Sequence, residues 1–444
     1  MPESAGYYDR RSIKNPLKQT SYVTHNPYVS HNNGENMTAE ELIEKSEKEL
    51  AEKFKLADKI SEYNQEKVLK AFNAHSIALR HFNATTGYGY GDDGRFALGE
   101  VFAKSLGAET GIVSPALLSG THALTVALFG VLRTGDAVLC VSGMPYDTIR
   151  GVIYGEGNGS LKDFGISFDC TELLENGKFD KETIKADIQR LGEALKMIYI
   201  QRSRGYELRD AFTCDEIEDI CSFIRSLGFK GCIFCDNCYG EFVEMREPCQ
   251  VGADVCVGSL IKNPGGGLAP TGGYIVGKEE YIDKIGRRLT APSIGNEVGS
   301  YAYGYRLFYQ GLFLAPHVVN QAIKGSLLIG KCMETLGYEN FPKLDKTPAD
   351  ITRAIRFDTA EQLCAFIQSV QEASPVDSFV TLEPWDMPGY DSKVIMAAGC
   401  FVEGASIELS ADAPVKEPYT AYFQGGLTYE HCKYALKKIL AKLL

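Results

Sequence analysis

Apolar and polar positions alternate with a regular rhythm along the middle of the chain. Between about residues 110 and 277, short apolar runs are separated by amphipathic segments of helical length, which is typical of βα units around a parallel sheet. The predicted strands lie in "DAVLCVSG", "KMIYIQRS", "CIFCDNC", "DVCVGSL" and "TGGYIVG". We therefore expect an α/β fold with a mostly parallel central sheet and helices on both faces.

The pattern changes towards both ends of the chain. Residues 1–36 are polar and lack periodicity, so they are predicted to form an irregular arm. "TAEE" at Thr38 has the capping-box pattern, and apolar residues follow at helical spacing. After about residue 330 the elements become shorter and mixed, and "YEHCKYALKKILAKLL" predicts a terminal helix. The expected parts are the arm (1–36), a helical segment (37–80), a large domain (81–328) and a small C-terminal α+β domain (329–444).

Composition and charge narrow the class of protein. A chain of 444 residues is too long for one ordinary core, and a net charge of -12 argues against a nucleic-acid surface. No run of 18 apolar residues and no signal-peptide pattern is present, so no membrane association is expected. Thirteen cysteines scattered over the chain suit a reducing cytoplasm better than a disulfide framework. A cytoplasmic protein that acts on small molecules is expected.

One lysine lies where a charge is costly. In "GSLIKNPGGG", Lys262 stands between a predicted buried strand and a cluster of glycines. Lysine is seldom buried without a partner, so a loop lysine that reaches water would be the ordinary explanation. If the amine is desolvated at the end of the sheet, its pKa should fall and it should become nucleophilic.

Other predicted strand ends carry residues that suit the same site, since ligands of open parallel sheets bind at the carboxyl ends of the strands. Ser119, Gly120 and Thr121 open a predicted helix whose N-terminus is a possible anion site. Asp236 ends the strand "CIFCD", Ser259 lies three residues before Lys262, and Tyr146 follows "DAVLCVSG". In isolation, the helix start is equally well explained as an ordinary cap, and Asp236 and Tyr146 are more readily explained as a turn residue and a packed tyrosine.

Together these residues match what pyridoxal 5'-phosphate requires. The cofactor needs a phosphate cradle, an aromatic plate, a carboxylate for the pyridine nitrogen and a lysine for the Schiff base. Asp236 and Lys262 are far enough apart for one βα crossover between neighbouring strands. The sequence therefore predicts a pyridoxal-phosphate enzyme.

The chain also resembles a known family over residues 40 to 435. The sequence is similar to the aluminium-resistance, methionine gamma-lyase-like branch of the fold-type I pyridoxal-phosphate enzymes of Cys/Met metabolism. The resemblance rests on "TTGYGYGDDGR", "SGTHAL", "ALFGVLRTGD", "IQRSRGY", "DNCYGEFVE", "GSLIKNPGGGLAPTGGYIVG", "QGLFLAPHVV" and "YFQGGLTYEH". It implies a homo-oligomer, a dimer or a dimer of dimers (homotetramer), that catalyses carbon–sulfur bond elimination.

The resemblance also implies roles for individual residues. Lys262 would be the Schiff-base lysine, Asp236 the partner of the pyridine nitrogen and Tyr146 the stacking ring. Ser119, Gly120, Thr121 and Ser259 would hold the phosphate. A tyrosine and an arginine ahead of the cradle would reach the phosphate of the neighbouring subunit; the best matches are Tyr90 and Arg95, with Tyr88 as the rival tyrosine.

Substrate binding departs from the family pattern. Better-studied relatives keep a carboxylate-binding arginine near the C-terminus, but no arginine follows Arg356 here. Either Lys416 takes this role, or Arg204 of "IQRSRGY" does so at the end of a predicted strand, where Gly205 predicts a turn. Both arginines of that motif, Arg202 and Arg204, could instead pair with acidic neighbours. An aminotransferase or another amino-acid lyase is the alternative activity, because it would use the same cofactor residues.

A metal module is a different possibility. Cys232, Cys235 and Cys238 have the spacing C-x-x-C-x-x-C, which suits zinc or an iron–sulfur cluster. In a strand, however, Cys232 and Cys235 would point to opposite faces, and no fourth ligand motif follows nearby. We therefore expect no metal, and cysteines that pack as small apolar residues.

Overall fold

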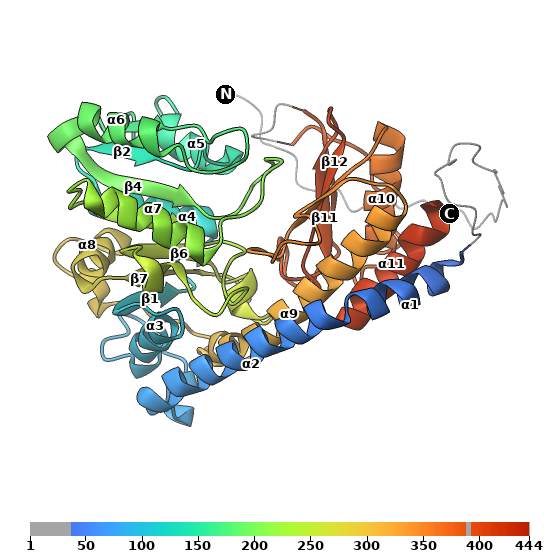
Figure 1. Ribbon diagram of the computed structural model, residues 1–444. Coiled ribbons are helices and arrows are strands. Elements are labelled where there is room, and N and C mark those ends of the chain that lie inside the picture. The colour runs from blue at the N-terminus through green and yellow to red at the C-terminus, as the bar shows by residue number, and fades with distance from the viewer. Residues whose placement is uncertain (1–36, 388–391, 444) are drawn as a thin grey trace, which may run out of the picture. The chain divides into compact units, whose positions relative to one another are not determined.

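The computed structural model describes residues 37–387 and 392–443, so the predicted arm of residues 1–36 lies outside the described residues. A seven-stranded sheet has the order β1-β7-β6-β5-β4-β2-β3 (Figure 1). Only β7 runs antiparallel to its neighbours. The strands are β1 (Thr110–Ser114), β2 (Ala137–Cys140), β3 (Ser167–Cys170), β4 (Leu195–Gln201), β5 (Cys232–Asp236), β6 (Val255–Ser259) and β7 (Gly273–Gly277). The mostly parallel sheet and all five predicted strands are confirmed.

Helices cover both faces of this sheet, as expected. Side chains alternate along each strand, so every second residue packs on the same layer. Cys232 packs with the layer formed by α4 (Gly120–Val131), α5 (Asp147–Tyr154) and α8 (Glu279–Leu289). Cys235 packs on the opposite face, with α3 (Asp93–Ser105), α6 (Lys181–Leu191) and α7 (Cys214–Ser226). The prediction that these two cysteines face opposite ways is confirmed.

A second sheet is built from the C-terminal part of the chain. It is antiparallel with the order β10-β11-β12-β9-β8. The strands are β8 (Asn340–Phe341), β9 (Arg353–Arg356), β10 (Val394–Ala397), β11 (Ser410–Pro414) and β12 (Thr420–Gln424). Apolar side chains of β11 and β12 share a core with α10 (Ala360–Glu372) and the predicted terminal helix, α11 (Tyr429–Leu443). The small α+β region thus forms one sheet with helices packed against it.

Long helices run beside both sheets. The capping box at Thr38 is present and starts α1 (Ala39–Glu49), after which α2 (Ala51–Ala74) lies along α9 (Arg306–Thr335) (Figure 1). The expected division at residues 328 and 329 falls inside α9. This helix has the length and apolarity of a membrane span, but 72% of its apolar window is buried inside the protein, as in the core helix of a soluble protein. The remaining short 3-10 helices are η1 (Leu79–Phe82), η2 (Gly192–Ala194), η3 (Pro248–Val251), η4 (Asn263–Gly265) and η5 (Gly295–Glu297).

Candidate active site

Lys262 and Asp236 line the same cavity at the carboxyl ends of the parallel strands. Asp236 is the last residue of β5, and Lys262 follows the end of the neighbouring strand β6 by three residues. The connection between these strands contains the short η3 and no α-helix, so the predicted βα crossover is replaced by a loop. The cavity measures about 350 Å³, within the range of small-molecule sites. We call it the lysine cavity; its wall includes Tyr146, Cys238, Tyr239, Asp412, Tyr422 and Gln424.

Lys262 is enclosed rather than extended into water. Its Nζ lies 3.8 Å from the centroid of the Tyr239 ring, a cation–π contact. Burial lowers the pKa of Lys262, but acidic groups around it, with Cys238 the strongest and Asp236 included, outweigh burial and hold this pKa above its ordinary value. The expectation of a depressed lysine pKa is therefore wrong, because the amine is buried among acidic groups and not by itself.

Asp236 is deeply buried at the end of β5. Its Oδ1 accepts a hydrogen bond from the Cys238 backbone N–H at 3.1 Å, and its Oδ2 lies 3.5 Å from the Tyr199 hydroxyl. Burial raises the pKa of Asp236, and Lys262 opposes that rise. Asp236 therefore presents a carboxylate to the cavity with few donors to stabilise its charge.

The N-terminus of α4 lies next to the end of β6. Ser119 is the N-cap, and its hydroxyl accepts from the His122 N–H at 3.1 Å. The N–H groups of Gly120 and Thr121 donate to no other residue in the described parts of the chain. A Cβ on Gly120 would lie 3.2 Å from the Ser259 Cβ and 3.6 Å from the Cys238 Sγ, so the helix start approaches β6 closely. The predicted residues Ser119, Gly120, Thr121 and Ser259 are therefore neighbours in space.

Tyr146 connects this helix start to the lysine cavity. Its hydroxyl lies 3.2 Å from the Thr121 Oγ1, and its backbone N–H donates to Gln201 Oε1 at 2.9 Å. Burial raises the pKa of Tyr146, so its hydroxyl stays protonated. Gln201 thus fixes the start of α5 and the position of the tyrosine ring.

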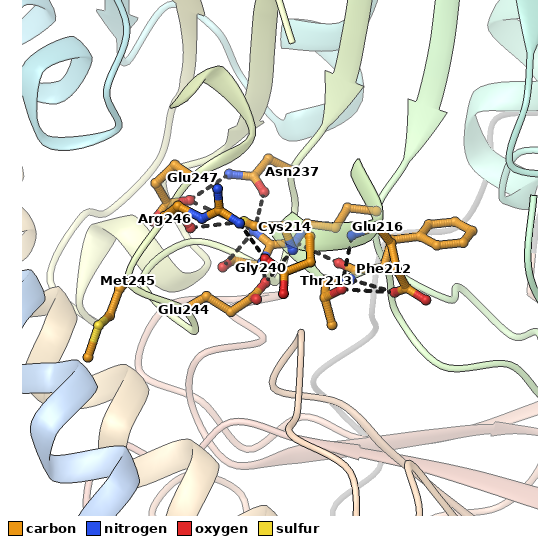
Figure 2. A network of polar contacts seen from close by, with 12 residues as sticks. Phe212, Thr213, Cys214, Glu216, Asn237, Gly240, Glu244, Met245, Arg246 and Glu247 are labelled. Atoms are coloured by element: carbon orange, nitrogen blue, oxygen red, sulfur yellow. Dashed lines mark hydrogen bonds and ion pairs between the residues drawn. The ribbon is translucent and has the colours of Figure 1, made fainter. Parts of the chain in front are cut away.

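The two arginines of "IQRSRGY" have different surroundings. The buried Arg202 guanidinium donates to Asn237 Oδ1 at 2.8 Å and to the Gly240 carbonyl at 3.0 Å. Figure 2 shows the network of polar contacts to which Asn237, Gly240 and Glu244 belong. Arg202 also donates to the Phe212 carbonyl at 3.2 Å and to Glu244 Oε2 at 2.5 Å, and it faces Glu247 at 3.8 Å. The hydrogen bonds of Arg202 therefore stabilise the loop after β5.

Arg204 is also buried, but its guanidinium is poorly satisfied. Its only ion pair among the described residues is a long one, 3.8 Å from Nη2 to Asp350 Oδ1. Nε and Nη1 have no hydrogen-bond partner in the described parts of the chain. A buried guanidinium with free donors is suited to receive an anionic ligand.

Arg204 lines a second cavity of about 390 Å³. This arginine cavity also contains Lys416, whose side chain is exposed. The arginine and lysine cavities adjoin, since their walls share Tyr146, Asp147, Gly205, Tyr206 and Tyr422. Both residues predicted to bind a substrate carboxylate thus line a cavity that adjoins the lysine cavity, Arg204 buried and Lys416 exposed.

Tyr88, Tyr90 and Arg95 do not line the lysine cavity of their own chain. The two tyrosines are 71% and 68% exposed, with ring centroids 5.4 Å apart. Arg95 donates to the Asn296 carbonyl at 2.5 Å and to the Gly89 and Glu297 carbonyls at 3.4 Å. The two tyrosines are therefore exposed on a loop, and Arg95 is half-buried in the first turn of α3.

Several residues of the lysine cavity were not predicted from the sequence. Tyr239 has a positive φ of 73°, which is unusual outside glycine, and the Asn263 side chain holds its carbonyl at 2.9 Å. The one sequence feature that could have identified Tyr239 as a site residue is its position three residues after Asp236. Asp412 and Tyr422 come from the second sheet, and no local pattern connects them with Lys262.

The cysteine motif does not form a metal site. Cys232 and Cys235 lie on opposite faces of the sheet, and Cys238 belongs to the wall of the lysine cavity. No group of three His, Cys, Asp or Glu side chains suited to a metal ion occurs within residues 37–387 and 392–443.

Comparison with known proteins identifies the family. The sequence model of the methionine gamma-lyase family matches residues 39–444. The Bacillus subtilis (strain 168) protein YnbB is 46% identical over 415 residues, which cover 92% of this chain and 98% of that protein. A carbon-sulfur lyase involved in aluminium resistance from Clostridium novyi NT has a solved structure with a TM-score of 0.88 and 44% identity, covering 91% of this chain and 96% of that chain.

More distant structures agree on the fold. YhfS of Escherichia coli, a pyridoxal-5'-phosphate dependent protein, has a TM-score of 0.58 at 15% identity and covers 92% of this chain and 98% of its own. The architecture is that of the fold-type I enzymes, as the sequence resemblance implied. With the match over nearly all of the described residues, the chain belongs to the methionine gamma-lyase family.

Proposed function

We propose that this protein is a pyridoxal 5'-phosphate-dependent carbon–sulfur lyase that acts on a sulfur-containing amino acid by β- or γ-elimination. The observation that carries the proposal is the meeting of Lys262 and Asp236 in one cavity, which the N-terminus of α4 adjoins through Tyr146. Membership of the methionine gamma-lyase family and the similarity to a carbon-sulfur lyase support it.

The residues of the lysine cavity and of the neighbouring helix start fit the cofactor. The unbonded N–H groups of Gly120 and Thr121, with the hydroxyls of Ser119 and Ser259, suit a phosphate at a helix N-terminus. The buried carboxylate of Asp236 suits a cationic ring nitrogen. Lys262 would hold the cofactor covalently, and Tyr146 would stack on its ring. When bound, the cofactor supplies an electron sink for the negative charge that develops at the substrate Cα.

The protein side chains would orient the substrate and move its protons. Arg204 would bind the α-carboxylate through its free Nε and Nη1 donors, which fixes the amino acid relative to the site. Lys416, at the rim, is the rival carboxylate ligand. The Lys262 amine is the natural base that takes the proton from Cα, because no other amine lines this cavity among the described residues.

An aminotransferase would use the same lysine, carboxylate and phosphate cradle, and it is the alternative activity. The relatives favour elimination, since those with a stated activity are lyases. Transamination would return the substrate nitrogen as a new amino acid, whereas elimination releases it as ammonia.

The products therefore test the proposal. Purified holoenzyme should convert at least one of cystathionine, cysteine, methionine or homocysteine into a 2-oxo acid, ammonia and a sulfur product in equal amounts. The sulfur product is a thiol from cystathionine or methionine and hydrogen sulfide from cysteine or homocysteine. Borohydride reduction should attach the cofactor to the peptide that contains Lys262. Labelling of a different lysine, or 2-oxo acid formation without ammonia, would contradict the proposal.

The assembly is proposed to be a cytoplasmic homo-oligomer, a dimer or a dimer of dimers. The support is that Tyr88 and Tyr90 are exposed and, with Arg95, lie outside the site of their own chain. In an oligomer this loop would reach the phosphate of the neighbouring subunit, with Tyr90 and Arg95 the expected contacts.

A further inference from the structure

A cluster of thiols lies on the α7 face of the large sheet, outside the lysine cavity. Cys221 comes from α7, Cys235 from β5 and Cys256 from β6, and all three are buried in one apolar core. Cys235 and Cys256 are direct cross-strand neighbours, so their side chains point to the same face. Cys249, in η3, packs against this core and is partly exposed. The fold thus gathers four free thiols from four elements on one side of the sheet.

Two of these sulfurs are in direct contact. The Cys249 Sγ lies 3.1 Å from the Cys256 Sγ, and both thiols are free. A disulfide has an S–S length of about 2.05 Å, so bond formation requires an approach of roughly 1 Å. β6 is paired with β5 and β7, whereas η3 belongs to a connecting loop, so η3 is the part that can move. The pair is therefore placed for a cross-link with little change in the sheet.

A surface hollow of about 310 Å³, which we call the thiol hollow, gives access to Cys249. Its wall also contains Arg225, Asp254 and Lys278. These charged groups are paired with one another, because Arg225 and Lys278 both form ion pairs with Asp254, the second at 2.8 Å. The hollow therefore leaves its thiols as the groups open to reaction.

The position of each thiol separates the first reactant from the second. Cys221 also lines the thiol hollow, but it is only 2% exposed, and burial raises its pKa to about 12. The thiolate is the nucleophilic form of cysteine, so Cys221 is a poor first reactant. Burial also raises the pKa of Cys256, but its contact with the Cys249 sulfur holds it within reach of that one partner. A reagent from solvent thus reacts first with Cys249, and Cys256 reacts next.

We propose that Cys249 and Cys256 form a peroxide-reactive thiol pair, a modification site that takes a small hydroperoxide. The Cys249 sulfur attacks one peroxide oxygen, which breaks the O–O bond, gives a sulfenic acid and releases water or an alcohol. The Cys256 sulfur then attacks the Cys249 sulfur, the S–O bond breaks, and the oxygen leaves as water with the Cys256 proton. Two electrons pass from the two thiols to the peroxide, and the product is a disulfide that a dithiol reduces.

The test treats the purified holoenzyme with hydrogen peroxide, alkylates the remaining thiols in denaturant and maps the peptides without reduction. A peptide pair containing Cys249 and Cys256, lighter by two hydrogen atoms, should be the main cross-link and should disappear after dithiothreitol. Two of the thirteen cysteines should escape alkylation. Cys364, on α10, is the internal control, because it is also partly exposed but bonds to no other cysteine in the described parts of the chain. It should not be cross-linked.

Two variants separate the pair from its neighbours. Cys249→Ser should abolish the cross-link and leave Cys256 alkylatable, whereas Cys221→Ser should retain the cross-link. Unchanged melting temperature and cofactor absorbance show that each variant is folded, and Cys249→Ala is the second choice if serine lowers them. Over-oxidation of Cys249 without a cross-link, a bond from Cys249 to Cys221, or a cross-link of Cys256 that persists in Cys249→Ser would overturn the proposal.

Discussion

Replacing Arg204 by methionine removes a buried guanidinium whose main task, on the proposed function, is to bind the substrate. Its Nε and Nη1 have no partner in the described residues, and the pair with Asp350 is 3.8 Å long. Methionine keeps most of the side-chain volume without the charge. We therefore expect a binding defect with a smaller effect on folding than the loss of Arg202, because the buried Asp350 keeps its hydrogen bond from the Thr352 N–H at 3.0 Å.

The magnitude follows from the lost ion pair. Truncating one partner of a buried charge pair costs about 2–5 kcal/mol, and about 1.4 kcal/mol corresponds to a factor of ten. Arg204→Met should thus raise the KM for amino-acid substrates by about 30- to 3,000-fold. The cofactor absorbance should persist, because Lys262 and Asp236, which are expected to hold the cofactor, line the lysine cavity and not the arginine cavity.

Arg202→Met is the matched control, since it lies two residues away and is equally buried. Arg202 bonds to Phe212, Asn237, Gly240 and Glu244, so its loss leaves buried polar groups unpaired. The free energy of unfolding should fall by about 3–5 kcal/mol. Steady-state kinetics and denaturant unfolding of both variants measure the contrast.

The same assays identify the result that would refute this reasoning. If Lys416→Met raises KM strongly and Arg204→Met does not, the carboxylate site belongs to the C-terminal region. If Arg204→Met unfolds the protein as Arg202→Met should, the guanidinium is structural.

Three further predictions follow from the site and its surroundings. Asp236→Asn should retain the cofactor spectrum but lose at least about a hundredfold in turnover, since a buried charge pair of about 3 kcal/mol is lost; near wild-type turnover would make Asp236 a turn residue. Mixing the inactive variants Lys262→Ala and Arg95→Ala should restore some activity if subunits share sites, and no recovery after proven subunit exchange would contradict a shared site. Burial raises the pKa of Glu241 from 4.5 to about 8, so the native state retains a proton that the unfolded chain loses, and stability falls as pH rises through that window, by up to about 5 kcal/mol. Glu241→Gln should flatten this dependence in denaturant titrations at pH 5 and pH 8, and an unchanged slope would refute the assignment.

Local patterns in the sequence were sufficient to predict much of the fold. The capping box at Thr38 and the N-cap at Ser119 depend on residues three positions apart, so both were predictable and both are present. The buried strands before Asp236 and Lys262 are continuous apolar runs with clear ends. Because strand ends of a parallel sheet meet at one edge, the sequence alone also brought these two residues together.

Properties that depend on residues far apart in the sequence could be read only from the tertiary structure. Arg202 and Arg204 belong to one short motif, yet only Arg202 is enclosed by acceptors from the loop after β5. The pKa of Lys262 moved opposite to expectation because groups from other elements surround the amine. Asp412 reaches the cavity from a separate sheet, more than 100 residues along the chain from Lys262. The pKa of a side chain, its burial and its bonding partners depend on how the chain packs, so no local sequence pattern determines them.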